Sequence, residues 1–188
     1  ITTTPADNVY AGSSTVTNSI ASVSGGNFEN LTANPASVTT TVTDEPVADV
    51  TGLSLSASAN VAEGGSIVYT ATLTNAAQSP VTVTLSNGQQ ITIATGQTTG
   101  TVSVAAPTDD VYVDAGTVSA TISGATGGGF EQLTINPAAA TTSITDTIDT
   151  VTATLSASAS VAEGNAITYT VNLSAPAQSA VSVTLANG

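Results

Sequence analysis

Three aspartates crowd the segment PTDDVYVDAG at residues 107–116: Asp109, Asp110 and Asp114. Carboxylates at this spacing repel one another, and the sequence holds no lysine, arginine or histidine that could neutralise them. Either some of these carboxyl groups keep their protons, with raised pKa values, or a hard cation binds among them. Ca²⁺ takes oxygen ligands in flexible geometry, Mg²⁺ requires a stricter octahedron, and Zn²⁺ favours the His and Cys side chains that the sequence lacks. The segment therefore predicts a calcium site.

Other acidic residues concentrate at two further places along the chain. The segment VAEG carries Glu63, and a strand end with the linker after it carries Asp146 and Asp149. The candidate calcium ligands are Glu63, Asp109, Asp110, Asp114, Asp146 and Asp149, together with Asp7, Asp44, Glu45 and Asp49 nearer the start of the chain. For Asp7 or Asp49 taken alone, a turn-forming role in which the carboxylate bonds its own backbone is an equal alternative.

Long internal repeats organise the sequence. The segment LSASANVAEGGSIVYTATLTNAAQSPVTVTLSNG at 55–88 recurs 100 residues later, and the segment at 107–146 has a counterpart 102 residues earlier. This pattern predicts the C-terminal half of a repeat at 1–46, a complete repeat at 47–148 and the N-terminal half of the next repeat at 149–188. Half of such a unit cannot bury its own apolar face. The chain is therefore expected to be a slice of a longer tandem array, with neighbouring repeats as its partners.

Short segments with alternating apolar and polar residues fill the complete repeat. They are LSLSAS (53–58), IVYTATLT (67–74), VTVTLS (81–86), ITIAT (91–95), TVSVAA (101–106), TVSATIS (117–123) and TTSITD (141–146). Seven short strands separated by turn signals predict an all-β fold made of tandem antiparallel Ig-like β-sandwich repeats of about 100 residues. Val, Ile, Leu and Tyr are expected to face the core, and Thr and Ser to face water. The segments GGNFE and GGGFE are interpreted as turns, and Glu29 and Glu131 within them as turn or surface residues.

These strands must position the acidic loops. In a sandwich of this connectivity, the loop after the first strand, the PTDD loop and the exit of the last strand share one end. Glu63, the loop 109–114 and Asp146 are therefore expected to converge there.

The composition excludes several classes of function. A chain without a basic residue does not bind nucleic acid or anionic lipid through its own charges. The sequence contains no apolar run long enough to insert into a membrane, no signal peptide opens it, and Ile1 is interpreted as an interior cut. Without His, Cys, Lys or Arg, Ser and Thr have no partner that would activate them, so neither an enzyme nor a small-molecule substrate is expected. Paired carboxylates serve glycosidases, but here they recur in a loop without an aromatic-lined cleft.

The order VAEG, PTDDVYVDAG, TSITD resembles the Calx-β pattern of calcium-binding acids. By this resemblance Glu63 matches the early Glu, the loop aspartates match the D-D-x-x-x-[D/E] spacing, and Asp146 matches the final acid. The first repeat segment departs from the pattern, because Asn8 and Gly12 replace two of the loop acids.

More closely, the whole chain resembles the extender repeats of large RTX biofilm adhesins of the LapA type. The resemblance rests on the hundred-residue period, the missing Cys, Lys and Arg, and segments such as VTLSNGQQITIATG and ATTSITDT. It implies a type-I-secreted protein held at the outer membrane and exposed at the cell surface. It also implies that calcium ions at the linkers stiffen a rod that projects a distal adhesive domain during biofilm formation.

The sequence thus favours a structural extender module. The alternative is an adhesion module that itself binds carbohydrate or another ligand. Such a module normally exposes aromatic side chains, and the sequence has only four Tyr and two Phe.

Overall fold

Only β-strands and loops make up this protein. The structure is a computed structural model that describes residues 1–186, and within them lie fourteen β-strands and no helix. None of these residues therefore belongs to a helix that could cross a membrane. The β-branched Thr and Val residues explain the preference for extended structure, because they lose side-chain freedom in a helix. The predicted all-β class is confirmed.

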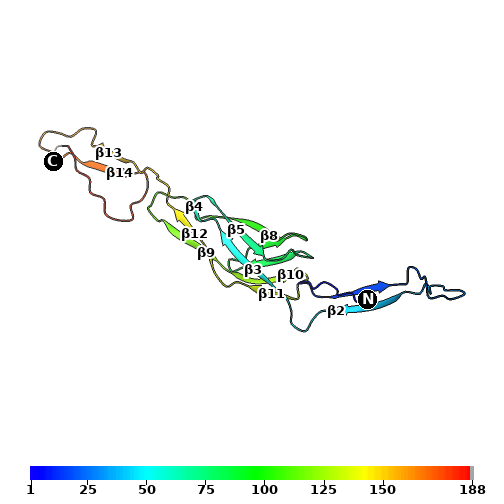
Figure 1. Ribbon diagram of the computed structural model, residues 1–188. Helices are drawn as coiled ribbons and strands as arrows, with labels where there is room; N and C mark the ends of the chain where they lie inside the picture. The colour runs from blue at the N-terminus through cyan, green and yellow to red at the C-terminus, as the bar shows by residue number, and fades with distance from the viewer. Residues whose placement is uncertain (187–188) are drawn as a thin grey trace.

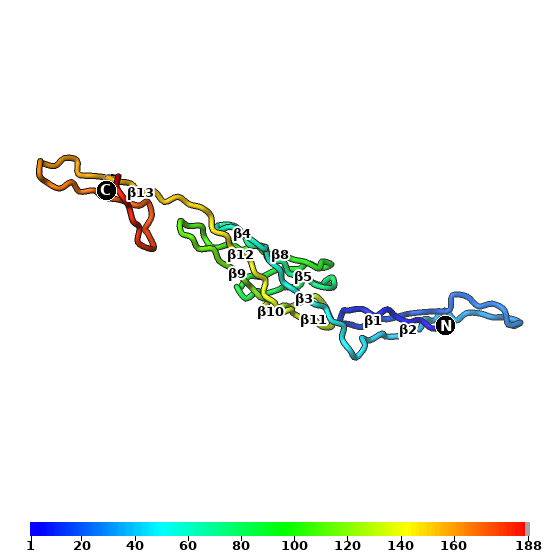
Figure 2. The backbone as a smooth tube through the Cα atoms, turned by 60° about the vertical axis from the view of Figure 1, so that its left-hand side comes forward, coloured from blue at the N-terminus to red at the C-terminus, as the bar shows by residue number. Residues whose placement is uncertain are grey.

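The chain is elongated, with a central body between two hairpins that extend from its opposite ends (Figures 1 and 2). One sheet of the body has the strand order β11 (Gln132–Ile135), β3 (Val50–Ala57), β5 (Ser66–Leu73) and β8 (Thr99–Ala105). A second has the order β10 (Ile122–Gly127), β6 (Val81–Leu85) and β7 (Gln90–Ile93). A third has the order β4 (Asn60–Ala62), β12 (Ala140–Thr145) and β9 (Gly116–Ala120).

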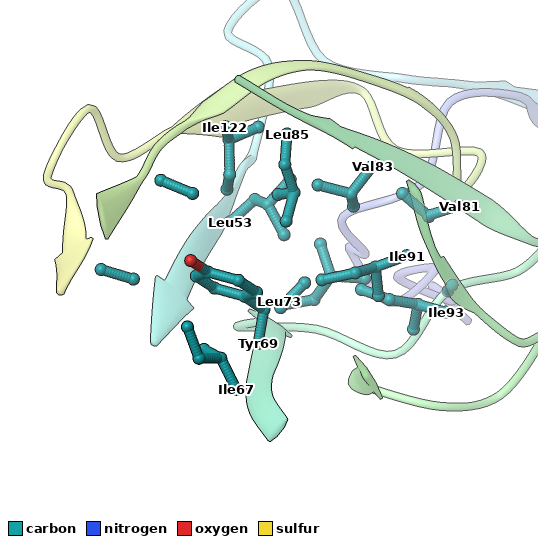
Figure 3. Close-up of a cluster of buried hydrophobic side chains, with 14 of the residues drawn as sticks. Leu53, Ile67, Tyr69, Leu73, Val81, Val83, Leu85, Ile91, Ile93 and Ile122 are labelled. Carbon is teal, nitrogen blue, oxygen red and sulfur yellow. The ribbon is translucent and has the colours of Figure 1, made fainter. Parts of the chain in front are cut away.

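The core lies between the four-stranded sheet and the other two sheets (Figure 3). Alternate residues of β5, β6 and β7 supply most of it: Ile67, Tyr69, Ala71, Leu73, Val81, Val83, Leu85, Ile91 and Ile93. Burying a large apolar side chain of this kind contributes about 1.5–3 kcal/mol. The expectation that threonines face water is wrong at Thr51 and Thr142, which are fully buried. Asn75 Nδ2 donates a hydrogen bond to the Thr51 hydroxyl, which explains why burial is tolerated there.

The strand arrangement differs from the sequence prediction in two ways. Pairing is not antiparallel throughout, because β11 runs parallel to β3 and β12 runs parallel to β4. The segment 117–123, predicted as one strand, is divided near Thr121 into β9, which pairs with β12, and β10, which pairs with β6. Thr121 and Ser86 exchange hydrogen bonds at this point, and the pairing of β10 with β6 then shifts register between Ile122 and Gly124.

The flanking hairpins repeat pairings of the central body. Strands β13 (Ala153–Ala157) and β14 (Tyr169–Leu173) pair in the register of β3 and β5, shifted by 100 residues. Strands β1 (Ser13–Asn18) and β2 (Val38–Thr43) pair in the register of β9 and β12, shifted by 102 residues. Tyr169 is 44% exposed, whereas its counterpart Tyr69 is 0% exposed, so the hairpins lack the second layer that covers the body. The division into 1–46, 47–148 and 149–188 stays a prediction, and the last two residues of its third segment lie outside the described residues.

Candidate metal centres

Three carboxylates meet at one edge of the sheet that contains β12. The ligand oxygens of Glu63, Asp114 and Asp146 lie within 4.8 Å of one another, and we call these residues the loop cluster. Glu63 directly follows β4 and Asp146 directly follows β12, which are parallel neighbours, so both strands end at the same edge. Asp114 lies just before β9, the antiparallel neighbour of β12, which begins at that edge. The sheet pairing therefore brings the three acids together.

Backbone hydrogen bonds fix the turn that carries Glu63. The Glu63 amide donates to the Thr145 carbonyl at 3.0 Å, and the Gly64 amide donates to the Pro107 carbonyl at 2.7 Å. Gly64 has a φ of +68°, a conformation that favours glycine. These bonds tie the VAEG turn to the end of β12 and to the start of the PTDD loop.

The loop cluster gathers negative charge around one buried carboxylate, that of Glu63. Glu63 is only 7% exposed, and its Oε2 atom has no hydrogen-bond partner; Asp146 Oδ1 is buried and equally unpartnered. A hydrogen bond with Asp114, then loss of water, then the charges of Asp114, Asp146 and Asp110 raise the pKa of Glu63 to about 7. In the absence of a cation, a proton on Glu63 relieves this repulsion. A bound cation would replace that proton.

The other acids predicted for this region have different roles. Asp109 accepts a hydrogen bond from the Thr147 hydroxyl, and Asp110 Oδ1 accepts one from the Tyr112 amide at 2.7 Å. Both aspartates therefore brace the PTDD loop, although the charge of Asp110 also acts on Glu63. Asp149 is exposed and lies outside the loop cluster.

A second group of acids lies at the other end of the central body, where β2 leads into β3. The ligand oxygens of Asp7, Glu45 and Asp49 lie within 4.8 Å of one another, and we call these residues the junction cluster. Asp7 precedes β1, Glu45 follows β2, and Asp49 directly precedes β3, so the cluster joins the first hairpin to the body. Asp44 stays outside it, because its Oδ2 atom accepts a hydrogen bond from the Gly12 amide at 2.9 Å.

Glu131 completes this junction, and sequence reasoning missed it. Its Oε2 atom accepts a hydrogen bond from the Asp49 amide at 2.7 Å, and its Oε1 atom is buried without a partner. A hydrogen bond from its own backbone lowers the pKa of Glu45, but loss of water and the charges of Asp7 and Glu131 outweigh it and raise the pKa overall. Glu131 does lie in a bend, as interpreted, but that interpretation missed the contact of its side chain with the start of β3. Its equivalence to Glu29, beside an equally repeated Phe, was the signal available in the sequence.

The two ends of the body are not chemically equivalent. In the repeat alignment Asp7 corresponds to Asp109, and Glu45 corresponds to Thr147. Where Asp7 and Glu45 form part of a three-carboxylate group, Thr147 instead donates its hydroxyl proton to Asp109. The junction cluster thus has no direct copy after β12 among residues 1–186.

The donor chemistry of both clusters fits a hard cation. All candidate ligands are carboxylate oxygens. Among residues 1–186, five side-chain polar atoms are buried without a hydrogen-bond partner, and three of them are carboxylate oxygens of Glu63, Asp146 and Glu131. Buried polar atoms are normally satisfied, and a bound cation would give these three oxygens a partner. Oxygen-only ligation at flexible loops suits Ca²⁺ better than Mg²⁺ or Zn²⁺.

Comparison with known families now identifies the class of protein. The model of the LapA domain family matches residues 1–45, 49–147 and 149–188, and the chain belongs to this family. Membership supports a role in a LapA-type adhesin, and with it biofilm adhesion and a place at the cell surface. No curated protein and no solved structure matches the chain.

Proposed function

We propose that this chain is a structural extender of a cell-surface RTX adhesin. Tandem Ig-like β-sandwich repeats, each contacting the next, would add length, and Ca²⁺ bound at their boundaries would stiffen the array that projects a distal adhesive domain. The observation that carries the proposal is the set of buried, unpartnered carboxylate oxygens: those of Glu63 and Asp146 in the loop cluster, and that of Glu131 beside the junction cluster. They occur in a chain with formal net charge −13 and no basic side chain.

The role of calcium follows from which segments the acids join. The loop cluster connects the ends of β4 and β12 to the loop before β9, and the junction cluster connects the first hairpin to β3. A cation bound by one ligand from each segment holds these segments together. Without the cation the carboxylates repel, and the boundary loosens. Because the ion binds only the folded, aligned state, it also stabilises that state by mass action.

The spacer role accounts for the aromatic residues better than a carbohydrate-binding role does. Tyr10 and Tyr112 both donate their hydroxyl protons to backbone carbonyls of the neighbouring segment, so both are engaged in contacts between segments. We assign no catalytic activity, and we propose secretion to the cell surface, neighbouring repeats as partners, and calcium as the only cofactor.

Thermal unfolding with and without calcium tests this proposal. With a Kd of about 10⁻⁴–10⁻³ M, typical of extracellular calcium modules, 10 mM Ca²⁺ stabilises the folded state by roughly 1.4–2.7 kcal/mol per site. The melting temperature should therefore rise clearly over that in a chelating buffer. The double variant Glu63→Gln/Asp146→Asn should lose a large part of the rise. Glu163→Gln should keep it, because Glu163 is the exposed counterpart of Glu63 in the last segment. Equal melting temperatures in calcium and in chelator would overturn the proposal.

A further inference from the structure

Two tyrosines reach across the boundaries between the central body and its neighbours. The Tyr10 hydroxyl donates to the Ala76 carbonyl at 2.8 Å, and the Tyr112 hydroxyl donates to the Pro176 carbonyl at 2.8 Å. The two tyrosines are equivalent under the 102-residue repeat, and the two acceptors are equivalent under the 100-residue repeat. The same contact thus forms at both boundaries. We propose that this tyrosine is a latch, independent of metal, that docks each repeat onto the following one; this rests on the proposed tandem extender role.

The first boundary shows the full contact. The rings of Tyr10 and Phe130 stack with centroids 5.9 Å apart and planes inclined by 23°. The same two residues form an antiparallel bridge. The Ala11 amide donates to the Gly129 carbonyl at 3.0 Å, and the Glu131 amide donates to the Val9 carbonyl at 3.1 Å. An extended segment of one repeat therefore pairs with the GGF turn of the next through this bridge, and the tyrosine ring stacks on the phenylalanine of that turn.

The receiving surface is built from two loops that are fastened together. The Gln78 amide donates to the Gly128 carbonyl at 2.9 Å, and the Gly128 amide donates to Ser79 Oγ at 3.1 Å. These bonds hold the turn before Phe130 against the loop after β5, which also presents the Ala76 carbonyl. Gly128 has a φ of +91°, and a Cβ there would collide with the Phe130 ring. Glycine is therefore required for the ring to lie where Tyr10 stacks on it.

The latch and the candidate cation site act on one boundary through different groups. None of the latch contacts uses a carboxylate, so removal of a metal takes no partner away from them. The hydrogen bond from the Glu131 amide to the Val9 carbonyl nevertheless fixes the backbone of Glu131. The side chain of the same residue accepts a hydrogen bond from Asp49 of the junction cluster. The latch thus sets how two repeats are aligned, and a cation bound beside it would stiffen that alignment. At the second boundary residues 149–186 include the acceptor Pro176 but no counterpart of Phe130, so the contact there is the hydroxyl bond alone.

Amide hydrogen exchange on the whole 188-residue chain, in a calcium-chelating buffer, tests the latch. The Ala11 and Glu131 amides should be protected in the unsubstituted protein. Tyr10→Ala should lower their protection on the order of tenfold, because it removes both the aromatic pair and the hydroxyl bond. Tyr10→Phe keeps the ring and should lower protection by roughly threefold. In both variants, protection of the core amides of Tyr69 and Val83 should not change, which separates loss of the latch from loss of the fold.

Phe28→Ala is the matched control. Phe28 is the repeat counterpart of Phe130 but is 67% exposed, so its replacement should leave the Ala11 and Glu131 amides protected. Unprotected amides in the unsubstituted protein, or equal protection in Tyr10→Ala, would overturn the latch. The extender proposal fails by a different result, namely a melting temperature that ignores calcium. Protected boundary amides in chelator together with such a result would retain the latch and reject the calcium role.

Discussion

Under the proposed calcium role, protons would compete with calcium for Glu63, which predicts a steep pH dependence of calcium binding. The pKa of Glu63 is raised to about 7 by its hydrogen bond to Asp114, its burial and the neighbouring charges. A ligand carboxyl must lose its proton before it coordinates a metal. At about pH 8 a group with this pKa is roughly nine-tenths ionised, and at about pH 6 roughly one-tenth ionised. The apparent calcium affinity of the loop cluster should therefore fall about tenfold between these pH values. An ordinary Glu, with a pKa of 4.5, would change by only a few per cent.

The stability of the calcium-free protein should also depend on the protonation of Glu63. It should fall as the pH rises, whereas the calcium affinity should increase. Because the pKa of Glu63 is higher in the folded state than the ordinary 4.5, the folded state binds the proton more tightly than the unfolded chain. This contribution to stability is fully present below about pH 4.5 and is lost as the pH rises through about 7. In chelator the melting temperature should thus decline between about pH 5 and pH 8. Saturating calcium should remove or reverse that decline.

Isothermal titration calorimetry in buffers of different ionisation enthalpy measures both affinity and proton release. Binding should release about half a proton at pH 7 and nearly a whole proton at pH 6. Glu63→Gln should abolish this release and weaken binding more than tenfold, whereas Glu163→Gln should change neither. A calcium affinity that stays level from pH 8 to pH 6 would show that Glu63 is ordinarily ionised, and the account of the loop cluster would be wrong.

Three further changes test other parts of the structure. Glu131→Gln should weaken calcium binding at the junction cluster, measured by the same titration, whereas Glu29→Gln at the exposed repeat counterpart should have no effect. Tyr69→Phe removes a buried hydroxyl without a partner and should leave the free energy of unfolding within about 1 kcal/mol of the original. Tyr69→Ala should lower that free energy by about 3–5 kcal/mol, because it empties part of the core. Similar denaturant midpoints for the two variants would contradict the assigned core. Gly100→Ala should destabilise the protein, because a Cβ at this position would collide with the backbone of Thr92. Gly124→Ala should not, because nothing lies within 4 Å of a Cβ at that position. Equal melting temperatures for the two variants would argue against the close packing of β7 and β8.

The sequence predicted the features that depend on local pattern. The alternation of apolar residues located β5, β6 and β7, and the connectivity of the predicted sandwich indicated that Glu63, Asp114 and Asp146 would lie near one another, as they do. The features that it missed depend on which strands become neighbours. Parallel pairing of β4 with β12 has no local signature, and neither has the transfer of the chain between sheets at Thr121.

Glu131 illustrates the same limit at the site. Its segment GGGFE indicates a turn, which is correct locally, but its side chain reaches the junction cluster because Glu131 pairs with Val9 of the preceding segment. Contacts between repeats depend on how two neighbouring units are placed relative to each other. No spacing of residues along the sequence indicates that placement. The repetition of Tyr10 as Tyr112 and of Phe28 as Phe130 was visible, but the function of these aromatic residues followed only from the contacts.

We propose that calcium stiffens the boundaries of this extended chain. Small-angle X-ray scattering of the whole chain, in millimolar calcium and in chelator, measures this most directly. We predict a longer maximum dimension and a scattering profile typical of a rigid rod in calcium, with a shorter, more flexible profile in chelator. Superimposable scattering profiles in the two buffers, at protein concentrations where the chain is monomeric, would contradict the account.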